Sequence, residues 1–291
     1  MFIDIHSHAY RKIGPPRNGK QWFSTPEQLL KRYDAIGIEK GVLLPLVSPE
    51  VYLPQSNEDI LEMVDNFPDR FIPFCNIDPR ALTNSADAPL DDLLRYYRDR
   101  GCKGIGEVMP NMPFLHPMVQ NLFKHVQDVG FPLTFDISDR IGGDYGLYDD
   151  AGLAQLEECL RKFSKLIILG HGPAFWAEIG QLETPNDRAG YPNYPIREEG
   201  IVPKLFRRHE NLYGDLSAGS GYNALARDHD YAIQFLNEFQ DRLMFGTDIC
   251  APDQPAPLAK FLTELKDKKK INIEVFNKVA RENAIKLLDL K

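Results

Sequence analysis

The stretch MFIDIHSHAYRK (residues 1–12) opens the chain with the pattern of a buried β-strand that ends in two histidines. Its first apolar residues are Phe2, Ile3 and Ile5, which are aromatic or β-branched and therefore favour a strand. We expect this strand to cover residues 1–5.

Three polar side chains alternate with these apolar residues. Side chains two positions apart on a strand point to the same side. We therefore expect Asp4, His6 and His8 to line one face of the strand. An H-x-H pair by itself is a weak signal, so its meaning depends on what the rest of the chain brings to that face.

Seven further apolar runs of strand length follow, and amphipathic helical segments separate them. The expected strands are residues 41–47, 70–77, 103–109, 131–137, 165–171, 211–217 and 242–248. The expected helices are residues 25–37, 56–68, 89–101, 118–130, 151–163, 197–210, 229–241, 256–268 and 273–289. The first helix has typical start and stop signals. Thr25 can cap its N-terminus, Pro26 can occupy its first turn, and Gly37 can end it.

Alternating strands and helices of this kind imply a parallel sheet. Eight strands are the number that closes a (β/α)8 barrel, and the 291 residues are enough for one. We therefore predict an α/β fold, a single (β/α)8 TIM barrel domain over residues 1–291. Long loops are expected after the fifth strand (residues 138–150) and the sixth strand (roughly residues 172–197). A doubly wound open sheet is the competing fold, but no glycine-rich phosphate loop follows an early strand.

The composition excludes several classes of protein. The chain is 43% hydrophobic and 26% charged, as globular proteins are, and its net charge of −8 with no long basic run argues against nucleic-acid binding. No apolar run approaches the roughly 18 residues of a membrane span, and no signal peptide precedes the first strand. The four cysteines form no C-x-x-C pair, which suits a reducing compartment. We expect a cytoplasmic protein with a small-molecule substrate, and a homodimer remains open.

Polar residues stand at the carboxyl ends of six of the eight expected strands, where the catalytic groups of such barrels lie. They are His6, His8, Glu107, Asp136, His171, Asp215 and Asp248. Imidazoles and carboxylates that converge on one point suit a divalent cation, which can activate a water molecule and polarise a carbonyl group. Asp4 is a candidate to support the ligand histidines, and Asp215 either braces them or anchors the seventh-strand loop.

The segments DIHSH, ILGHG, YGDLS, LMFGTD and ENAIKLLDL together resemble the metal-dependent amidohydrolase superfamily. More narrowly, they resemble the branch that contains aminocarboxymuconate semialdehyde decarboxylase and the resorcylate decarboxylases. The resemblance covers residues 2–288. It implies that His6 and His8 are metal ligands and that Asp248 is a ligand that can also accept a proton from water. It further implies that His171 polarises the substrate or shuttles a proton.

One position departs from this resemblance. The branch usually carries a histidine ligand at the end of the fifth strand, where this chain reads PLTFDI and has Asp136. Two ligand sets are then open: either Asp136 binds the ion itself, which favours manganese or iron, or Glu107 in GIGEV binds it instead. We favour Glu107 slightly. One divalent ion is expected, with zinc as the first choice.

The two long loops carry aromatic and basic residues, which suit a planar or carboxylated small molecule. Tyr145, Trp176 and Arg140 are the candidate substrate-binding residues.

Three functions follow from these observations. The first is a metal-dependent hydrolase that acts on a small organic acid, ester, lactone or amide through metal-activated water. The second is a nonoxidative decarboxylase of a small aromatic or unsaturated acid. The third is a metal-deficient barrel that only binds a ligand, because the usual histidine is absent at position 136.

Overall fold

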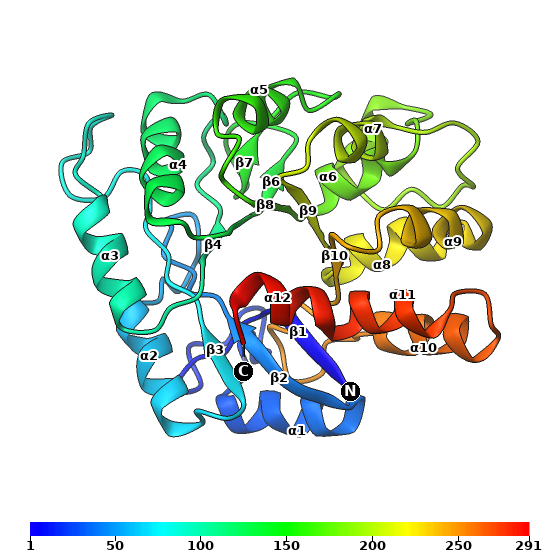
Figure 1. Cartoon of the computed structure of the whole chain (residues 1–291). Helices are drawn as coiled ribbons and strands as arrows, with labels where there is room; N and C mark the ends of the chain where they lie inside the picture. Colours follow the sequence, from blue (N-terminus) through cyan, green and yellow to red (C-terminus); the bar gives the residue numbers. More distant parts are fainter. Residues whose placement is uncertain (291) are drawn as a thin grey trace.

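Eight parallel strands form the centre of the computed structural model, which describes residues 1–290 (Figure 1). One group of three pairs in the order β1 (Phe2–Ser7), β2 (Ile38–Leu43) and β3 (Phe71–Pro73). A group of five pairs in the order β10 (Leu243–Met244), β9 (Leu212–Asp215), β8 (Ile168–Gly170), β5 (Leu133–Phe135) and β4 (Ile105–Val108).

Backbone pairing joins these two groups at both edges. Cys75, after β3, pairs in parallel with Ile105 of β4. Ser7 of β1 pairs in parallel with Ile249, after β10. The eight strands therefore close into a ring, which confirms the predicted TIM barrel and excludes the open sheet.

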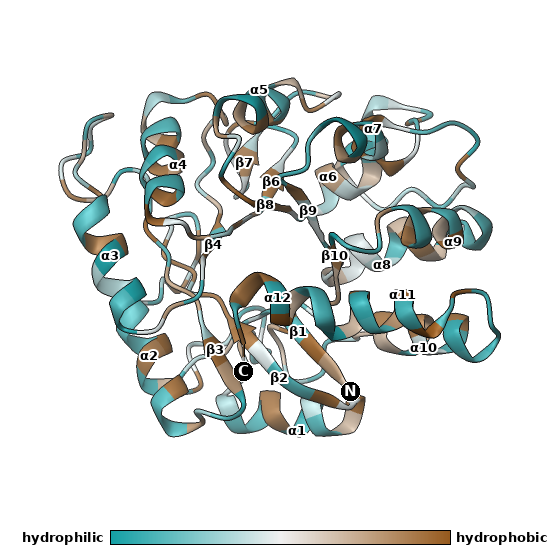
Figure 2. Cartoon of the chain, in the orientation of Figure 1, coloured by the Kyte–Doolittle hydropathy of each residue, from teal (hydrophilic) through white to brown (hydrophobic). Residues whose placement is uncertain are grey.

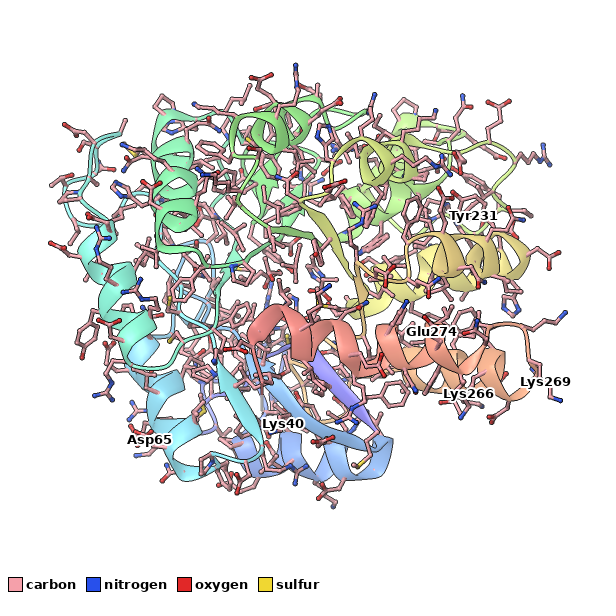
Figure 3. All side chains as sticks on the ribbon, in the orientation of Figure 1. Lys40, Asp65, Tyr231, Lys266, Lys269 and Glu274 are labelled. Carbon is pink, nitrogen blue, oxygen red and sulfur yellow. The ribbon has the colours of Figure 1, made fainter. Side chains whose placement is uncertain are left out.

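Helices surround the strands, and Figure 2 shows their apolar faces turned toward the barrel. They are α1 (Pro26–Ile36), α2 (Asn57–Asn66), α3 (Asp91–Asp99), α4 (Pro117–Val129), α5 (Ala154–Lys162), α6 (Pro173–Trp176), α7 (Ile201–Arg208), α8 (Ala218–Ala226), α9 (His229–Glu238), α10 (Leu258–Asp267), α11 (Ile273–Asn277) and α12 (Asn283–Leu288). Charged side chains such as Asp65, Lys269 and Glu274 are exposed on the outer rim (Figure 3). The first helix begins at its expected cap, because Thr25 and Gln28 form a reciprocal capping box.

Helix α8 was not expected from the sequence. Its residues read AGSGYNALA, and glycine and serine are weak helix formers. Their small side chains give no clear apolar stripe, so the pattern indicates a loop. The helix forms here in a tertiary setting in which Ala224 and Leu225 are buried.

The two long loops are more structured than their sequences indicate. After β5, a two-stranded ladder forms between β6 (Ile137–Ser138) and β7 (Leu147–Tyr148). After β8, the chain forms α6 and two 3-10 turns, η1 (Ala177–Ile179) and η2 (Pro185–Ala189). Both loops follow the carboxyl ends of strands, so they lie at the end of the barrel that carries His6 and His8.

The opposite end of the barrel is filled by apolar side chains. Ile3, Met244 and Leu169 from three strands belong to one buried cluster with Ala284 and Leu288 of α12. A π-helical turn, η3 (Lys278–Glu282), leads into α12, which lies across the barrel in Figure 1. The barrel is therefore closed at the amino ends of its strands, and only the carboxyl end can admit a ligand. Within residues 1–290, no helix is long and apolar enough to cross a membrane.

Candidate metal centre

Strand β1 carries the two histidines to the carboxyl end of the barrel, beside the chain that leaves β10. All six residues of β1 are buried, and His6 and His8 are 0% and 1% exposed. The His6 carbonyl accepts a hydrogen bond from the Asp248 N–H at 2.8 Å. Closure of the barrel thus brings residue 248 next to both imidazoles, although the two segments lie at opposite ends of the sequence.

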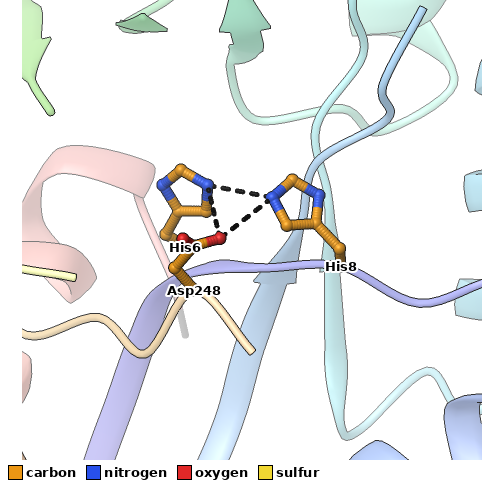
Figure 4. Close-up of side chains that lie close together, drawn as sticks. All are labelled: His6, His8 and Asp248. Atoms are coloured by element: carbon orange, nitrogen blue, oxygen red, sulfur yellow. Dashed lines mark hydrogen bonds and ion pairs between the residues drawn. The ribbon is translucent and has the colours of Figure 1, made fainter. Parts of the chain in front are cut away.

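Four side-chain atoms converge at this place. The Nε2 atoms of His6 and His8 are 3.0 Å apart, and Asp248 Oδ1 lies 3.6 Å from the first and 3.4 Å from the second (Figure 4). Glu107 Oε2, from β4, lies 3.6 Å and 3.5 Å from the same two nitrogens. Ligand atoms bound about 2.1 Å from a tetrahedral ion are about 3.4 Å apart. The atoms of His6, His8 and Asp248 therefore have the spacing and the chemistry of a ligand set for a divalent cation, and Glu107 Oε2 lies close to both nitrogens of that set.

Hydrogen bonds at the far side of each ring fix how the imidazoles point. His6 Nδ1 lies 2.6 Å from Asp215 Oδ2, and His8 Nδ1 lies 2.9 Å from the Leu44 carbonyl oxygen. Both partners accept, so each Nδ1 carries the proton and donates it. Each Nε2 then presents a lone pair to the centre of the cluster, as a metal ligand must.

Two of the supporting acidic residues have distinct roles. Asp215 has both of the expected roles: its Oδ2 contacts His6 Nδ1 at 2.6 Å, and its Oδ1 accepts a hydrogen bond from the Ser217 N–H of the seventh-strand loop at 3.0 Å. Asp4 contacts no imidazole: its carboxylate accepts hydrogen bonds from the N–H and the hydroxyl of Thr247, at 2.8 and 2.6 Å. The β1 ladder is irregular between Asp4 and Ser7, and such irregularities redirect side chains. Asp4 therefore holds β1 to the segment that bears Asp248.

The backbone at Asp248 adopts a left-handed conformation, with φ of 52°. Such a conformation is costly for a residue other than glycine and is retained where neighbouring contacts hold it. Here the His6 carbonyl holds the Asp248 N–H, and the Gln254 side-chain amide donates to the Asp248 carbonyl. The Asp248 side chain is 22% exposed, so it reaches both the histidines and the space above them.

The charged groups in the cluster shift one another's pKa values. Burial alone would lower the pKa of His6, but the carboxylates of Asp215 and Glu107 outweigh it and raise that pKa well above its usual range. Burial alone would raise the pKa of Asp248, but the His8 contact and the charge of His6 hold it well below its usual range. Strongly shifted pKa values in one buried cluster are typical of functional sites.

Asp136 and His171 lie on the other side of Glu107. Glu107, Asp136 and His171 each offer a ligand atom within 4.8 Å of the others, and all three are buried. Burial and the neighbouring Glu107 raise the pKa of Asp136 well above its usual range. His171 Nδ1 lies 3.0 Å from Ser217 Oγ, and its Nε2 lies 3.6 Å from Glu107 Oε1. All the residues predicted to bind metal or move protons therefore meet at one place.

A cavity of about 750 Å³ opens above this cluster. Its lining residues include aromatic side chains, a single arginine and the cluster itself: Trp22, Phe23, Tyr52, Tyr145, Arg17, His8, Glu107, Asp136 and Asp248. The volume suits a small organic molecule.

Of the three predicted substrate-binding residues, only Tyr145 lines the cavity. Trp176 is 1% exposed, packs between Phe175 and Phe235, and donates its indole N–H to the Asp215 carbonyl at 2.8 Å. Its large apolar ring is used for the core, so this prediction is corrected. Arg140 is also corrected, because it is 59% exposed and pairs with Asp144 at 3.5 Å on the outer loop.

Trp22 and Arg17 occupy the places for which Trp176 and Arg140 were proposed. Both belong to the loop between β1 and α1, and the Arg17 guanidinium lies 4.8 Å from the centre of the Trp22 ring. Arg17 is the one lysine or arginine among the described residues that line the cavity. The sequence contained a signal for them, since this loop also follows the carboxyl end of a strand. Ser217, which holds His171, had no comparable signal.

The sequence profile of a family described as Amidohydrolase matches residues 3–290, nearly the whole chain. The chain belongs to the amidohydrolase family. Members of this family are generally dependent on divalent metal ions and act on small molecules. The candidate ligands of this amidohydrolase therefore occur in a family whose chemistry needs such a set.

Solved structures with the same fold cover the whole length of this amidohydrolase. 2,6-Dihydroxybenzoate decarboxylase from Rhizobium is 18% identical over 99% of this chain and 98% of its own, with a TM-score of 0.63. 5-Carboxyvanillate decarboxylase from Sphingomonas paucimobilis is 17% identical over 100% and 99%, with a TM-score of 0.61. A probable 2-pyrone-4,6-dicarboxylic acid hydrolase from Acinetobacter baumannii is 15% identical over 99% of both chains, with a TM-score of 0.59. No curated protein matches this amidohydrolase.

These findings confirm the resemblance that the sequence motifs suggested. The family is shown by its profile, and the similar structures include both decarboxylases and a probable hydrolase. At sequence identities of 15–18%, these similar structures establish the fold of the chain. The reaction has to be inferred from the residues of the site.

Proposed function

We propose that this protein is a metal-dependent hydrolase that acts on a small organic acid, ester, lactone or amide. The observation that carries the proposal is the convergence of His6 Nε2, His8 Nε2 and Asp248 Oδ1, at separations of 3.0 to 3.6 Å, with Glu107 Oε2 within 3.6 Å of both nitrogens, on the floor of a cavity. A divalent cation bound there supplies an activated water and polarises a substrate carbonyl. Two imidazoles with carboxylates suit zinc first, with manganese and iron as alternatives.

The geometry favours Glu107 over Asp136 as the fourth ligand of this set. Glu107 Oε2 lies within 3.6 Å of both ligand nitrogens, whereas Asp136 groups with Glu107 and His171. In this proposal Glu107 completes the set without a histidine at position 136. The hypothesis of a metal-deficient barrel depended on that missing histidine and loses its support.

The remaining residues have separate tasks in the proposed reaction. Asp248 stands at the boundary of the cluster and the cavity, where it can accept a proton from the attacking water. His171 is the alternative base, because its Nε2 faces the cluster. Arg17, which also lines the cavity, can bind an anionic group of the substrate, while Trp22, Tyr52 and Tyr145 cover its flat faces.

A nonoxidative decarboxylase is the second candidate. Two similar structures are named as decarboxylases of hydroxylated aromatic acids, and the aromatic walls of this cavity suit a planar ring. In that reaction the cluster would hold the substrate's hydroxyl and carboxylate, and a proton would be delivered to the ring carbon.

One screen tests the function and separates the two reactions. The zinc-loaded protein is incubated with lactones, esters and hydroxybenzoates in D2O, and the products are followed by mass spectrometry. Hydrolysis adds the elements of water, whereas decarboxylation releases carbon dioxide and places one deuterium on carbon. We expect turnover that is lost after chelation and in the His6→Ala/His8→Ala double variant, but kept in His229→Ala, which changes an exposed histidine on α9. Turnover that survives chelation and the double variant would contradict the proposal.

A further inference from the structure

The loop between β1 and α1 is basic, although the protein as a whole is acidic. The chain has a net charge of −8, yet residues 10–24 contain four basic residues and no acidic one: Arg11, Lys12, Arg17 and Lys20. Arg11 is neutralised by Glu62, at 2.6 Å. Of the ion pairs within residues 1–290, none includes Arg17 or Lys20. The loop therefore presents uncompensated positive charge beside the cavity that Arg17 lines.

A two-residue hairpin sets Arg17 and Lys20 opposite each other. The Arg17 N–H donates to the Lys20 carbonyl at 2.9 Å, and the Lys20 N–H donates back to the Arg17 carbonyl at 3.1 Å. Asn18 and Gly19 form the turn between them, with the positive φ values of 52° and 74° that a type I′ turn needs. Directly opposed residues of an antiparallel pair point to the same face, with Cβ atoms about 4.5–5.5 Å apart. The two cations therefore share one side of the hairpin.

This pairing of charges costs stability while no anion is bound. Like charges directly opposite each other on paired strands destabilise the pair. Arg17 and Lys20 are both exposed, so no packing of the protein interior requires them at these positions. An anion that contacts both side chains replaces the repulsion with two attractive contacts.

Aromatic rings, and no carboxylate, hold the guanidinium group of Arg17. It lies 4.8 Å from the centre of the Trp22 ring and 5.7 Å from the centre of the Tyr52 ring. Tyr52 also fixes the chain that leads into the hairpin, because its hydroxyl donates to the Pro15 carbonyl at 3.2 Å. Contact with an aromatic face leaves the N–H donors at the edge of the guanidinium free to bind an anion.

We propose that Arg17 and Lys20 together bind a compact group with two negative charges, such as a phosphate ester, at the outer end of the substrate. Arg17 lines the cavity and Lys20 does not, so the bound group lies at the rim while the rest of the molecule reaches the floor. The planar donor set of an arginine and the point charge of a lysine both suit phosphate oxygens. This inference rests on the proposed function and narrows its substrate class from an anion to a dianion.

The alternative is that Arg17 alone binds a single negative charge and that Lys20 contributes nothing. Three probes with the same phenyl ring separate the two explanations. At pH 8 benzoate carries one negative charge, phenyl phosphate carries nearly two, since its second pKa is about 6, and phenylmalonate carries two on adjacent carboxylates. The last two probes distinguish a phosphate group from a pair of carboxylates.

Tryptophan fluorescence reports binding at this place. The chain has two tryptophans, and Trp176 is 1% exposed in the core, so a probe at the hairpin acts on the emission of Trp22. Dissociation constants are measured for each probe with the wild-type protein and with Lys20→Met. Lys12→Met is the matched control, because it removes the same charge from the same loop outside the hairpin, and circular dichroism checks that each variant is folded.

We expect the wild-type protein and the Lys12→Met control to bind phenyl phosphate at least about fivefold more tightly than benzoate. In Lys20→Met this preference should disappear, while the dissociation constant of benzoate stays nearly unchanged. The preference should persist in the His6→Ala/His8→Ala double variant, because the hairpin is separate from the metal centre. Equal preference for phenylmalonate supports a site for compact dianions in general, and none for phenylmalonate supports a site for phosphate groups.

Other outcomes overturn the inference or the proposed function separately. Equal affinity of the wild-type protein for benzoate and both dianions, or a preference that survives Lys20→Met, would remove the dianion site and leave the proposed function standing. Loss of the preference in a folded His6→Ala/His8→Ala variant would place the dianion at the metal centre instead. A dianion preference that Lys20→Met abolishes, in a protein that fails the turnover screen, would sustain the site and contradict the proposed function.

Discussion

At the scale of single residues, the site depends on where protons are held. Asp215 and the Leu44 carbonyl fix the protons of His6 and His8 on the far sides of the rings, so the lone pairs converge. This arrangement could be predicted only in part. The H-x-H pair and Asp248 could be recognised at strand ends, but the hydrogen bond of Ser217 to His171 depends on two loops that meet only in the folded chain.

Asp248→Asn should lower kcat by at least about a hundredfold, because asparagine keeps the shape but removes the base. Much of the metal should stay bound through His6 and His8, so turnover should fall far more than metal content. Steady-state kinetics with elemental analysis measure these effects, with Asp128→Asn, which changes an exposed carboxylate on α4, as the control. Wild-type turnover in a metal-loaded variant would make His171 the better candidate for the base.

Arg17→Met should weaken the binding of anionic substrates selectively. Charge-assisted hydrogen bonds contribute about 1.5–3 kcal/mol, so KM for a carboxylate substrate should rise about tenfold or more. KM for the matching neutral ester should change little, because the methionine still covers Trp22. Parallel kinetics on the acid and its ester test this. An equal rise in both KM values would show that Arg17 acts by packing and not by charge.

At the scale of elements, buried polar contacts tie the two long loops together. The Arg188 guanidinium, in η2, pairs with Glu178 at 2.6 Å and donates to the Asp149 carbonyl at 2.7 Å, and Arg188 is only 3% exposed. Glu178 in turn accepts from the Gly152 N–H at 2.7 Å. The sequence showed two long loops but no periodicity that pairs one with the other. The loops are joined by hydrogen bonds between this ion pair in one loop and the backbone of Asp149 and Gly152, which a local pattern cannot reveal.

Arg188→Met should destabilise the protein by about 3–5 kcal/mol, because it leaves the Glu178 carboxylate buried without its partner. Urea unfolding monitored by circular dichroism measures the loss. The double variant Arg188→Met/Glu178→Leu should recover a large part of it, since no charge is then left unpaired. A single variant as stable as the wild-type protein would show that the loops are held by other contacts.

Asp149, at the end of this loop, should make stability depend on pH. Burial raises the pKa of Asp149 to about 6, against the opposing effect of three backbone N–H donors. The unfolded value is about 3.9. The native state therefore holds this proton more tightly than the unfolded state does. The protonated Asp149 carboxyl group stabilises the fold fully below about pH 4, and this contribution is lost as the pH rises through about 6.

The stability of the wild-type protein relative to Asp149→Asn should accordingly fall by about 2 kcal/mol between pH 4 and pH 7. Chemical unfolding of both proteins across this range gives the difference. If that difference does not vary with pH, Asp149 titrates normally in the folded protein.

At the scale of the whole molecule, the fold could be predicted further than the site. Eight apolar runs separated by amphipathic segments specify a closed parallel barrel, because the number and order of elements leave few other topologies. Substrate contacts could not be predicted as well. Trp176 had the right residue type and the right loop but is buried in the core, whereas Trp22 reaches the cavity. The direction of a loop side chain follows from packing, which a sequence pattern does not encode.

The central claim is that residues from both ends of the chain hold one divalent cation at the mouth of the barrel. Anomalous X-ray diffraction from crystals of the zinc-loaded protein, collected on both sides of the zinc absorption edge, tests it most directly. We expect an anomalous peak about 2.0–2.2 Å from His6 Nε2, His8 Nε2 and Asp248 Oδ1, with Glu107 as a further ligand. A fully loaded protein with no peak at this place would contradict the claim.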